Sequence, residues 1–166
     1  MEVSPWLAKY GPRDTYSSDN RTMTSPAELK RIENARDYVR DSQNTSQVWA
    51  LMTVTSDSTL KLARKGKEYE EIFEYLGEGD MSFAYVKIII GDEVSRREKF
   101  VLITWVGPQV SPVKKGKMLL PRAEIDKIFE QRAKVIEAVD LSELDYKKVT
   151  DILVKAGGAD YGSSTS

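Results

Sequence analysis

The stretch GDEVSRREKFVLITWVG, residues 91–107, joins a turn, a group of three basic side chains and an apolar strand. Within residues 100–106, apolar side chains occupy both sets of alternating positions. Because successive side chains of a strand point to opposite faces of its sheet, such a strand has to be covered on both faces. We therefore expect residues 99–106 to form a central strand, with a basic cluster on rigid support at its start.

The composition excludes most forms of catalysis. The 166-residue chain contains no cysteine and no histidine. It therefore lacks thiolate nucleophiles, disulfides, Cys-ligated zinc and the imidazole that most often acts as a general base. Neither a Ser-His-Asp nor a Cys-His arrangement can form. Since no pair of carboxylates suggests a magnesium or glycosidase site, we expect no enzyme activity, no cofactor and no metal.

The chain is expected to hold one folded domain between two flexible ends. Residues 1–24 are polar, rich in turn residues and aperiodic, which is typical of a flexible arm. Residues 25–158 form the predicted domain, and residues 159–166 form a small, polar tail. No apolar run approaches the roughly 18 residues of a membrane-spanning helix, and the first residues do not resemble a signal peptide. These features predict a cytoplasmic protein.

The pattern of apolar residues predicts the element order αββαββαβα. The first helix begins at Ser25-Pro26, a capping serine followed by proline, and runs to about residue 40. Further helices are expected over residues 69–76, from about 117–120 to 134, and from Ser142 to the pair Gly157-Gly158. Strands are expected over residues 47–55, 59–64, 81–90, 99–106 and 135–139. Helices between pairs of strands indicate an α+β fold, an α-β-α sandwich with a central mixed sheet flanked by helices on both faces.

Basic residues are concentrated in one part of an otherwise balanced chain. The whole chain has 25 Lys plus Arg against 26 Asp plus Glu. Between residues 96 and 122 a single acid, Glu98, accompanies seven basic residues, which are Arg96, Arg97, Lys99, Lys114, Lys115, Lys117 and Arg122. Such segregation favours an acidic partner, although a solvated loop surface would produce the same pattern.

The class of acidic partner stays open between a protein surface and the headgroups of inositol lipids. Nucleic acid is not expected, because the net charge is balanced and aromatic side chains are not interleaved with the basic ones. Phe100 and Trp105 lie in the apolar strand, and we expect them in the core together with Trp49. Pro121 should lie in the first turn of the long helix. This start leaves Lys114 and Lys115 in the preceding loop, free to reach outward.

Residues 91–107 closely resemble the coactosin group of the actin-depolymerising-factor homology family, and residues 153–161, LVKAGGADY, resemble the C-terminal end of the same group. The resemblance extends over about residues 26–161. It implies the ADF-homology fold, a mixed five- or six-stranded sheet between helix pairs, and binding to actin filaments (F-actin) rather than catalysis. By match to the family pattern, Lys99 is the principal filament-binding candidate, with Arg96 and Arg97 beside it. Lys155 matches a second basic contact, and the segment containing Lys114, Lys115 and Lys117 would support them.

Two segments depart from the coactosin pattern. Residues 112–119 look more like the start of the long helix of cofilin, whereas the 1–24 arm replaces the short N-terminus of cofilin. The leading hypothesis is a monomeric, cytoplasmic protein of the actin cytoskeleton that binds the sides of filaments, with little or no monomer binding or severing. One alternative is a cofilin-like factor that binds monomers and severs filaments. Another is an adaptor that binds acidic phosphoinositides through the same basic residues.

Overall fold

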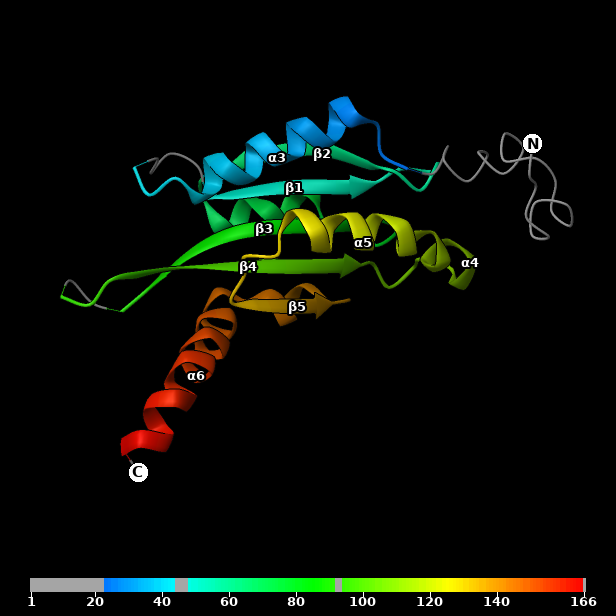
Figure 1. The fold of residues 1–166 in the computed structure, drawn as a ribbon. Helices are drawn as coiled ribbons and strands as arrows, with labels where there is room; N and C mark the ends of the chain where they lie inside the picture. The colour runs from blue at the N-terminus through cyan, green and yellow to red at the C-terminus, as the bar shows by residue number, and fades with distance from the viewer. Residues whose placement is uncertain (1–22, 44–47, 92–93, 166) are drawn as a thin grey trace, which may run out of the picture.

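The computed structural model describes residues 23–43, 48–91 and 94–165, and among them five strands form one sheet in the order β2-β1-β3-β4-β5 (Figure 1). The strands are β1 (Trp49–Val54), β2 (Leu60–Gly66), β3 (Met81–Ile90), β4 (Arg97–Val106) and β5 (Lys134–Ala138). Neighbouring strands are antiparallel except β4 and β5, which are parallel. The predicted mixed sheet is confirmed.

Helices cover both faces of this sheet (Figure 1). On one face, α3 (Pro26–Arg40) and α5 (Leu119–Ile128) pack on a core that includes Leu102 of β4. On the other face, the short 3-10 helices η2 (Tyr69–Tyr75) and η4 (Leu141–Leu144), with α6 (Tyr146–Thr165), pack on a core that includes Ile103. Adjacent residues of β4 thus serve different cores, as the apolar pattern of residues 100–106 predicts. The predicted α-β-α sandwich is confirmed.

Strand β4 is central and pairs with β3 over its full length. The register runs from Met81 opposite Val106 to Ile90 opposite Arg97. The turn that joins the two strands begins at Gly91, whose φ of 97° lies in a region that side chains other than glycine rarely adopt. β4 begins at Arg97, two residues earlier than predicted, because pairing with the apolar end of β3 extends the ladder into the basic cluster. Arg97 and Lys99 are therefore strand residues.

The two strand tryptophans belong to the core, as predicted. Trp49 and Trp105 are 1% and 2% exposed. Each indole N–H donates a hydrogen bond of 2.8 Å to a backbone carbonyl, that of Glu68 for Trp49 and that of Gly77 for Trp105. The Trp49 ring also fixes the end of β2, since a Cβ added at Gly66 would lie 2.2 Å from its Cζ2 atom. These contacts join the sheet to the segments that flank η2.

The long helix predicted to end near residue 134 is shorter and divided into three pieces. A single turn, α4 (Pro112–Lys115), leads into the 3-10 helix η3 (Gly116–Met118) and then into α5. Pro121 lies in the first turn of α5, as predicted, because the missing N–H costs no intrahelical bond there. The predicted end is wrong, since Phe129 leaves the helical conformation and buries its ring completely.

The predicted loop around Lys114 and Lys115 is also wrong. Both lysines lie in α4, where the hydroxyl of Ser111 accepts a 3.1 Å hydrogen bond from the Lys114 N–H. The proline after Ser111 occupies the first helical position, which suits its fixed φ and missing donor. The helical segment therefore begins at Pro112, after the serine cap, and not near Pro121 as the position of that proline alone indicated.

The start and end of the last helix differ from the prediction as well. The predicted start at Ser142 falls inside the separate 3-10 helix η4, which is capped by Asp140. The side chain of Asp140 accepts a hydrogen bond from the Ser142 N–H, and the side chain of Glu143 accepts one from the Asp140 N–H. The hydrogen bonds that Ser142 donates to its carboxylate hold the pKa of Asp140 below its ordinary value. α6 follows from Tyr146 and continues to Thr165, past the pair 157–158. A glycine inside a helix costs only about 1 kcal/mol, so it does not force a stop.

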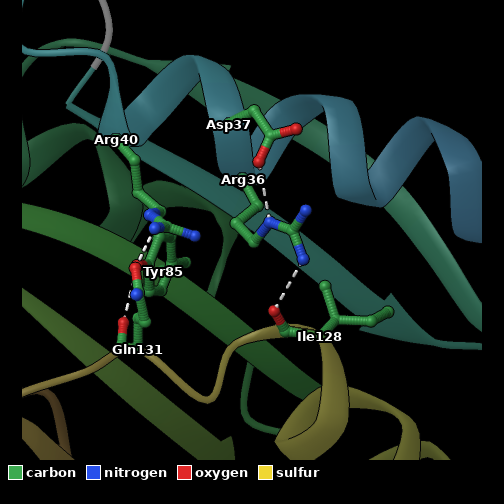
Figure 2. A network of polar contacts seen from close by, with 6 residues as sticks. All are labelled: Arg36, Asp37, Arg40, Tyr85, Ile128 and Gln131. Carbon is green, nitrogen blue, oxygen red and sulfur yellow. Dashed lines mark hydrogen bonds and ion pairs between the residues drawn. The ribbon is translucent and has the colours of Figure 1, made fainter.

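A polar network fixes α5 to α3 (Figure 2). Arg36 Nη1 of α3 donates a 3.0 Å hydrogen bond to the carbonyl of Ile128, the last residue of α5. Arg40 donates to the side chain of Gln131, and the Tyr85 hydroxyl of β3 donates 2.8 Å to the Gln131 carbonyl. Burial raises the pKa of Tyr85 to about 12. The network satisfies the carbonyl of Ile128 at the end of α5, where helices otherwise leave carbonyls without partners, and also the carbonyl of Gln131 beyond it.

The residue that enters the domain is held firmly. Thr24 is 5% exposed, and its hydroxyl donates to Glu124 Oε1 at 2.6 Å and accepts from the Leu60 N–H at 2.8 Å. Its own N–H donates to Glu124 Oε2 at 3.1 Å. Thr24 thus joins α5 to β2, whereas the sequence pattern places it in the arm. Of the rest of the predicted arm, Met23 is exposed and residues 1–22 lie outside the described residues.

Candidate functional site

The hairpin end, which we define as Arg96, Arg97 and Lys99 at the start of β4, contains the first group of predicted site residues. Both arginines are exposed and Lys99 is partly buried. The backbone of Lys99 is fixed in the sheet, opposite Ile88 of β3. The side chains of Arg96 and Lys99 form no hydrogen bond or ion pair with any residue that the structure describes. Asp92 and Glu93, in the turn before them, lie outside the described residues.

Alternation along β4 decides which way these side chains point. Arg97 and Lys99 belong to the same alternating set as Val101 and Ile103, which pack in the core beneath η2 and α6. Glu98 belongs to the opposite set, on the side of α3. Arg97 and Lys99 therefore extend one face of the strand beyond its apolar part, and Glu98 does not lie between them.

Glu98 has a cationic partner that the sequence analysis missed. Lys87 of β3 is only 5% exposed, and its Nζ lies 3.7 Å from Glu98 Oε2. The same Nζ donates a 2.9 Å hydrogen bond to the Asp41 carbonyl. The single acid in the basic segment is thus paired with a lysine outside that segment, which leaves the hairpin end positive. The sign of this pair in the sequence was Lys87 itself, a charged residue within the largely apolar strand β3.

A hollow of about 620 Å³ lies beside the hairpin end. Its lining includes Lys67, Tyr69, Arg96, Glu98 and Tyr146. The Tyr69 hydroxyl donates 2.6 Å to the Leu144 carbonyl, and the Tyr146 ring meets the Tyr69 ring edge-on at 5.1 Å. Burial, with the nearby Glu70 carboxylate, raises the pKa of both tyrosines, so both hydroxyls stay protonated at neutral pH. The lining carries charges of both signs, unlike the hairpin end beside it.

Lys155 lies on α6 and is exposed. The buried residues Val149 and Leu153 of this helix pack in the core cluster that contains Val101 and Ile103. Lys155 is therefore on the helix that covers the face toward which Lys99 points. In Figure 1, α6 descends from the half of the molecule that carries the β3–β4 hairpin.

The α4 end, which we define as Lys114, Lys115 and Lys117, lies at the other end of β4 (Figure 1). Strand β4, which starts within the hairpin end and stops before the α4 end, has ten residues and a length of about 30 Å at roughly 3.4 Å per residue. Lys114 Nζ donates 2.6 Å to the Gly79 carbonyl, and Lys117 Nζ donates 3.2 Å to the Ser56 carbonyl. The structure therefore divides the predicted basic site into two groups, and at the α4 end two cations contact other segments of the chain.

Exposed apolar side chains surround the α4 end, which the sequence analysis did not single out. Val113, Leu119 and Leu120 are 81%, 76% and 40% exposed. Val113 lies in α4, which has no buried residue, and Leu119 and Leu120 lie off the buried stripe of α5. The position of apolar residues outside the helical stripe was the signal that could have shown this surface. The α4 end thus combines positive charge with an apolar surface, which is typical of protein interfaces.

No metal centre is evident in the part of the chain that the structure describes, since no group of three or more acidic side chains there is placed to hold an ion. Within the same described ranges, no helix has the length and apolarity needed to cross a membrane.

Comparison with known proteins identifies relatives of the whole domain. The family model for cofilin/tropomyosin-type actin-binding proteins matches residues 28–153. Coactosin of Entamoeba histolytica is 31% identical over 142 residues, which cover 84% of this chain and 96% of that protein. A crystal structure of human coactosin-like protein superposes with a TM-score of 0.68 at 28% identity, covering 74% of this chain and 92% of that one. Mouse coactosin, an actin filament binding protein, gives a TM-score of 0.66 at 27% identity, covering 84% of this chain and 96% of that one.

Proposed function

Because the chain belongs to the family of cofilin/tropomyosin-type actin-binding proteins, we propose that it is a coactosin-type protein that binds along the sides of actin filaments. The coactosins match this chain over nearly the whole of their own length, and one of them is described as an actin filament binding protein. The observation that carries the proposal is the hairpin end, where Lys99 on the rigid strand β4 and Arg96 just before this strand have no side-chain partner among the described residues. A rigid support reduces the entropy lost on binding, and cations without internal partners are available to an acidic surface.

The basic residues have different roles in this proposal. Lys99, with Arg96 and Arg97, makes the principal contact with an acidic filament surface. Lys155 makes a second contact from α6. Lys114, Lys115 and Lys117 support binding from the opposite end of β4, more weakly, because two of them already donate hydrogen bonds to carbonyls of this chain.

Cosedimentation with actin filaments tests the principal contact. The variant Arg97→Ala with Lys99→Ala should bind at least about tenfold more weakly at physiological salt, since it removes two charges from the contact. The matched control is Lys61→Ala with Arg64→Ala, which removes one lysine and one arginine from the edge strand β2. The control should bind within about twofold of wild type. Equal binding of the hairpin variant and wild type would reject this site.

A second candidate function is monomer binding with filament severing, as in cofilin. The exposed Val113, Leu119 and Leu120 beside three lysines favour it, because an apolar surface with a basic rim fits a protein partner. Filament length under the microscope distinguishes the candidates: a side-binder leaves filaments intact, whereas a severing protein shortens them. If severing occurs and Leu119→Ser abolishes it without loss of filament binding, the α4 end carries this second function.

The remaining parts of the proposal concern activity, location and other partners. The family consists of actin-binding proteins, a non-enzymatic kind, and we propose that this chain has no catalytic activity, in line with its lack of His and Cys. We place it as a monomer in the cytoplasm, on the actin cytoskeleton. Binding to acidic phosphoinositides through the basic residues stays a prediction, and absence of binding to phosphoinositide-containing liposomes at low salt would dispose of it.

A further inference from the structure

Two helices of the described chain start in the same way, with an exposed serine followed by proline. Ser25 precedes α3 and Ser111 precedes α4, and both have extended backbones, with φ, ψ of −64°, 151° and −72°, 158°. The two hydroxyls accept hydrogen bonds of 3.2 Å and 3.1 Å from the N–H three residues on, at Glu28 and Lys114. A residue before proline is confined to this extended region, so each serine is displayed in a similar conformation.

The residues that follow the two serines carry opposite charge. Glu28, three residues after Ser25, accepts from the Leu62 N–H at 2.7 Å and pairs with Arg31 at 2.9 Å. At the corresponding place after Ser111 stands Lys114, followed by Lys115. Kinases distinguish their substrates by the pattern of charge around the acceptor, and a kinase whose substrate groove is acidic favours a basic residue three positions downstream. Only Ser111 of the two has such a residue.

The two serines also differ in how easily their surroundings can open. A kinase binds its acceptor segment in extended form, so the first helical turn has to unwind. α4 has four residues, none of them buried, and only its far end is joined to the helical segments η3 and α5. α3 has fifteen residues with buried Ile32, Ala35 and Val39, and its first turn is tied to β2 through Glu28. Opening at Ser111 therefore disturbs far less packing than opening at Ser25.

We propose that Ser111 is a phosphorylation site for a proline-directed serine kinase that selects a basic residue downstream, and that its modification lowers the positive charge of the α4 end. In the reaction, Ser111 Oγ forms a bond to the γ-phosphorus of ATP and the bond from that phosphorus to the β–γ bridging oxygen breaks. The hydroxyl proton passes to the catalytic base of the kinase, and ADP leaves. Ser111 needs no other co-reactant.

The phosphate would change the α4 end through its charge. A phosphoserine carries about −1.5 to −2 charges at neutral pH, which offsets much of the charge of Lys114, Lys115 and Lys117. The hairpin end lies about 30 Å away along β4, several Debye lengths at physiological salt, and should not sense it. Modification would therefore weaken contacts made by the α4 end and leave those of the hairpin end unchanged. This consequence for actin rests on the proposed function, whereas the modification itself does not.

The test uses the full chain with Ser4→Ala, because Ser4-Pro5 is the remaining serine-proline pair in the sequence. The chain is incubated with ATP and a proline-directed kinase of the basic-selecting class, and the phosphate is located by peptide mass spectrometry. Ser111 should be modified at least about tenfold faster than Ser25, and Lys114→Glu with Lys115→Glu should slow it by a similar factor. No phosphate on Ser111, or equal rates at Ser25 and Ser111, would overturn the proposal.

A second measurement separates this proposal from the proposed function. Stoichiometrically phosphorylated chain is compared with unmodified chain in filament cosedimentation, with Arg97→Ala and Lys99→Ala in parallel. Phosphorylation should weaken filament binding by at most about threefold, whereas the hairpin variant should weaken it by at least about tenfold. This result would support the proposal that the phosphate affects the α4 end and not the hairpin end. A phosphorylated chain that loses as much binding as the hairpin variant would overturn it. If Ser111 is modified but wild type does not bind filaments at all, the proposed function fails and the modification site stands.

Discussion

The two ends of strand β4 carry three basic residues each, but they differ in what those residues contact. At the hairpin end, Arg96 and Lys99 have no side-chain partner among the residues that the structure describes. At the α4 end, Lys114 and Lys117 donate hydrogen bonds to the carbonyls of Gly79 and Ser56. Equal charge in the sequence therefore does not mean equal availability to a partner. Arg96 and Lys99 of the hairpin end are available for binding, whereas Lys114 and Lys117 of the α4 end already contact other segments of the chain.

Charge reversal should show the largest difference between the ends. Arg97→Glu with Lys99→Glu should weaken filament binding by about 100-fold, close to 2.7 kcal/mol, because it both removes attraction and places like charges against an acidic surface. Lys114→Glu with Lys115→Glu should weaken binding by only about three- to tenfold. Both dissociation constants can be measured by cosedimentation over a range of actin concentrations. A larger loss at the α4 end would reverse the comparison.

The next effect concerns stability at the α4 end, where Thr24 joins β2 to α5. Thr24→Val keeps the shape but leaves the Glu124 carboxylate and the Leu60 N–H without this partner. We expect a loss of about 2 kcal/mol in the free energy of unfolding, measured by urea denaturation. Thr24→Ser, which retains the hydroxyl, should lose less than half as much. Filament binding of folded Thr24→Val should match wild type, and a parallel loss of binding would show that the α4 end contributes more than the comparison allows.

A smaller effect on the free energy of unfolding should distinguish lysines that donate hydrogen bonds to carbonyls of this chain from basic residues that do not. Lys114→Met with Lys117→Met removes two hydrogen bonds to carbonyls and should destabilise the chain by about 0.5–1 kcal/mol, a modest value because both side chains are exposed. Arg96→Met with Lys99→Met removes the same number of charges and should change stability by less than about 0.5 kcal/mol. Thermal or urea unfolding measures both. Equal losses would mean that the lysine–carbonyl bonds contribute nothing in solution.

The smallest expected effect is a difference between variants in how filament binding depends on salt concentration. Exposed charges are screened within about 8 Å at physiological ionic strength, so filament binding by wild type should weaken as salt rises from low to physiological values. The Arg97→Ala, Lys99→Ala variant should show a visibly flatter dependence than the Lys61→Ala, Arg64→Ala control. If the two variants respond to salt alike, the hairpin cations do not dominate the electrostatic contact.

The central strand was predictable because its information is local. Apolar residues on both alternating sets of residues 100–106 require cover on both faces, and that requirement fixed the layers of the fold. Its start at Arg97 was not predictable, because charged residues have a weak preference for strands. Pairing with Ile88 and Ile90 of β3 nevertheless holds residues 97–99 in the sheet. The same pairing determines that Arg97 and Lys99 are presented by a strand rather than by a loop.

The division of the basic residues into two ends was only partly visible in the sequence. The predicted strand between Lys99 and Lys114 implied their separation, but which cations stay available depends on tertiary contacts. Lys114 meets Gly79 and Lys117 meets Ser56, residues far away along the chain. Likewise, the cap at Ser111 and the exit of Phe129 from α5 determined where helices begin and end around Pro121. The buried Lys87 could have been noticed, but its pairing with Glu98 required the register of β3 on β4.

The anchoring of Thr24 has a practical consequence for imaging this protein in cells. A fluorescent protein fused directly to Thr24 in place of residues 1–23 would be attached where β2 meets α5, on the side of the α4 end, since Lys117 reaches the neighbouring β1–β2 turn. A fluorescent protein fused after α6 would be attached to the helix that descends from the hairpin half (Figure 1). The two fusions therefore obstruct different ends of the sheet. Comparing their recruitment to actin structures would report which end is engaged without altering a single charge.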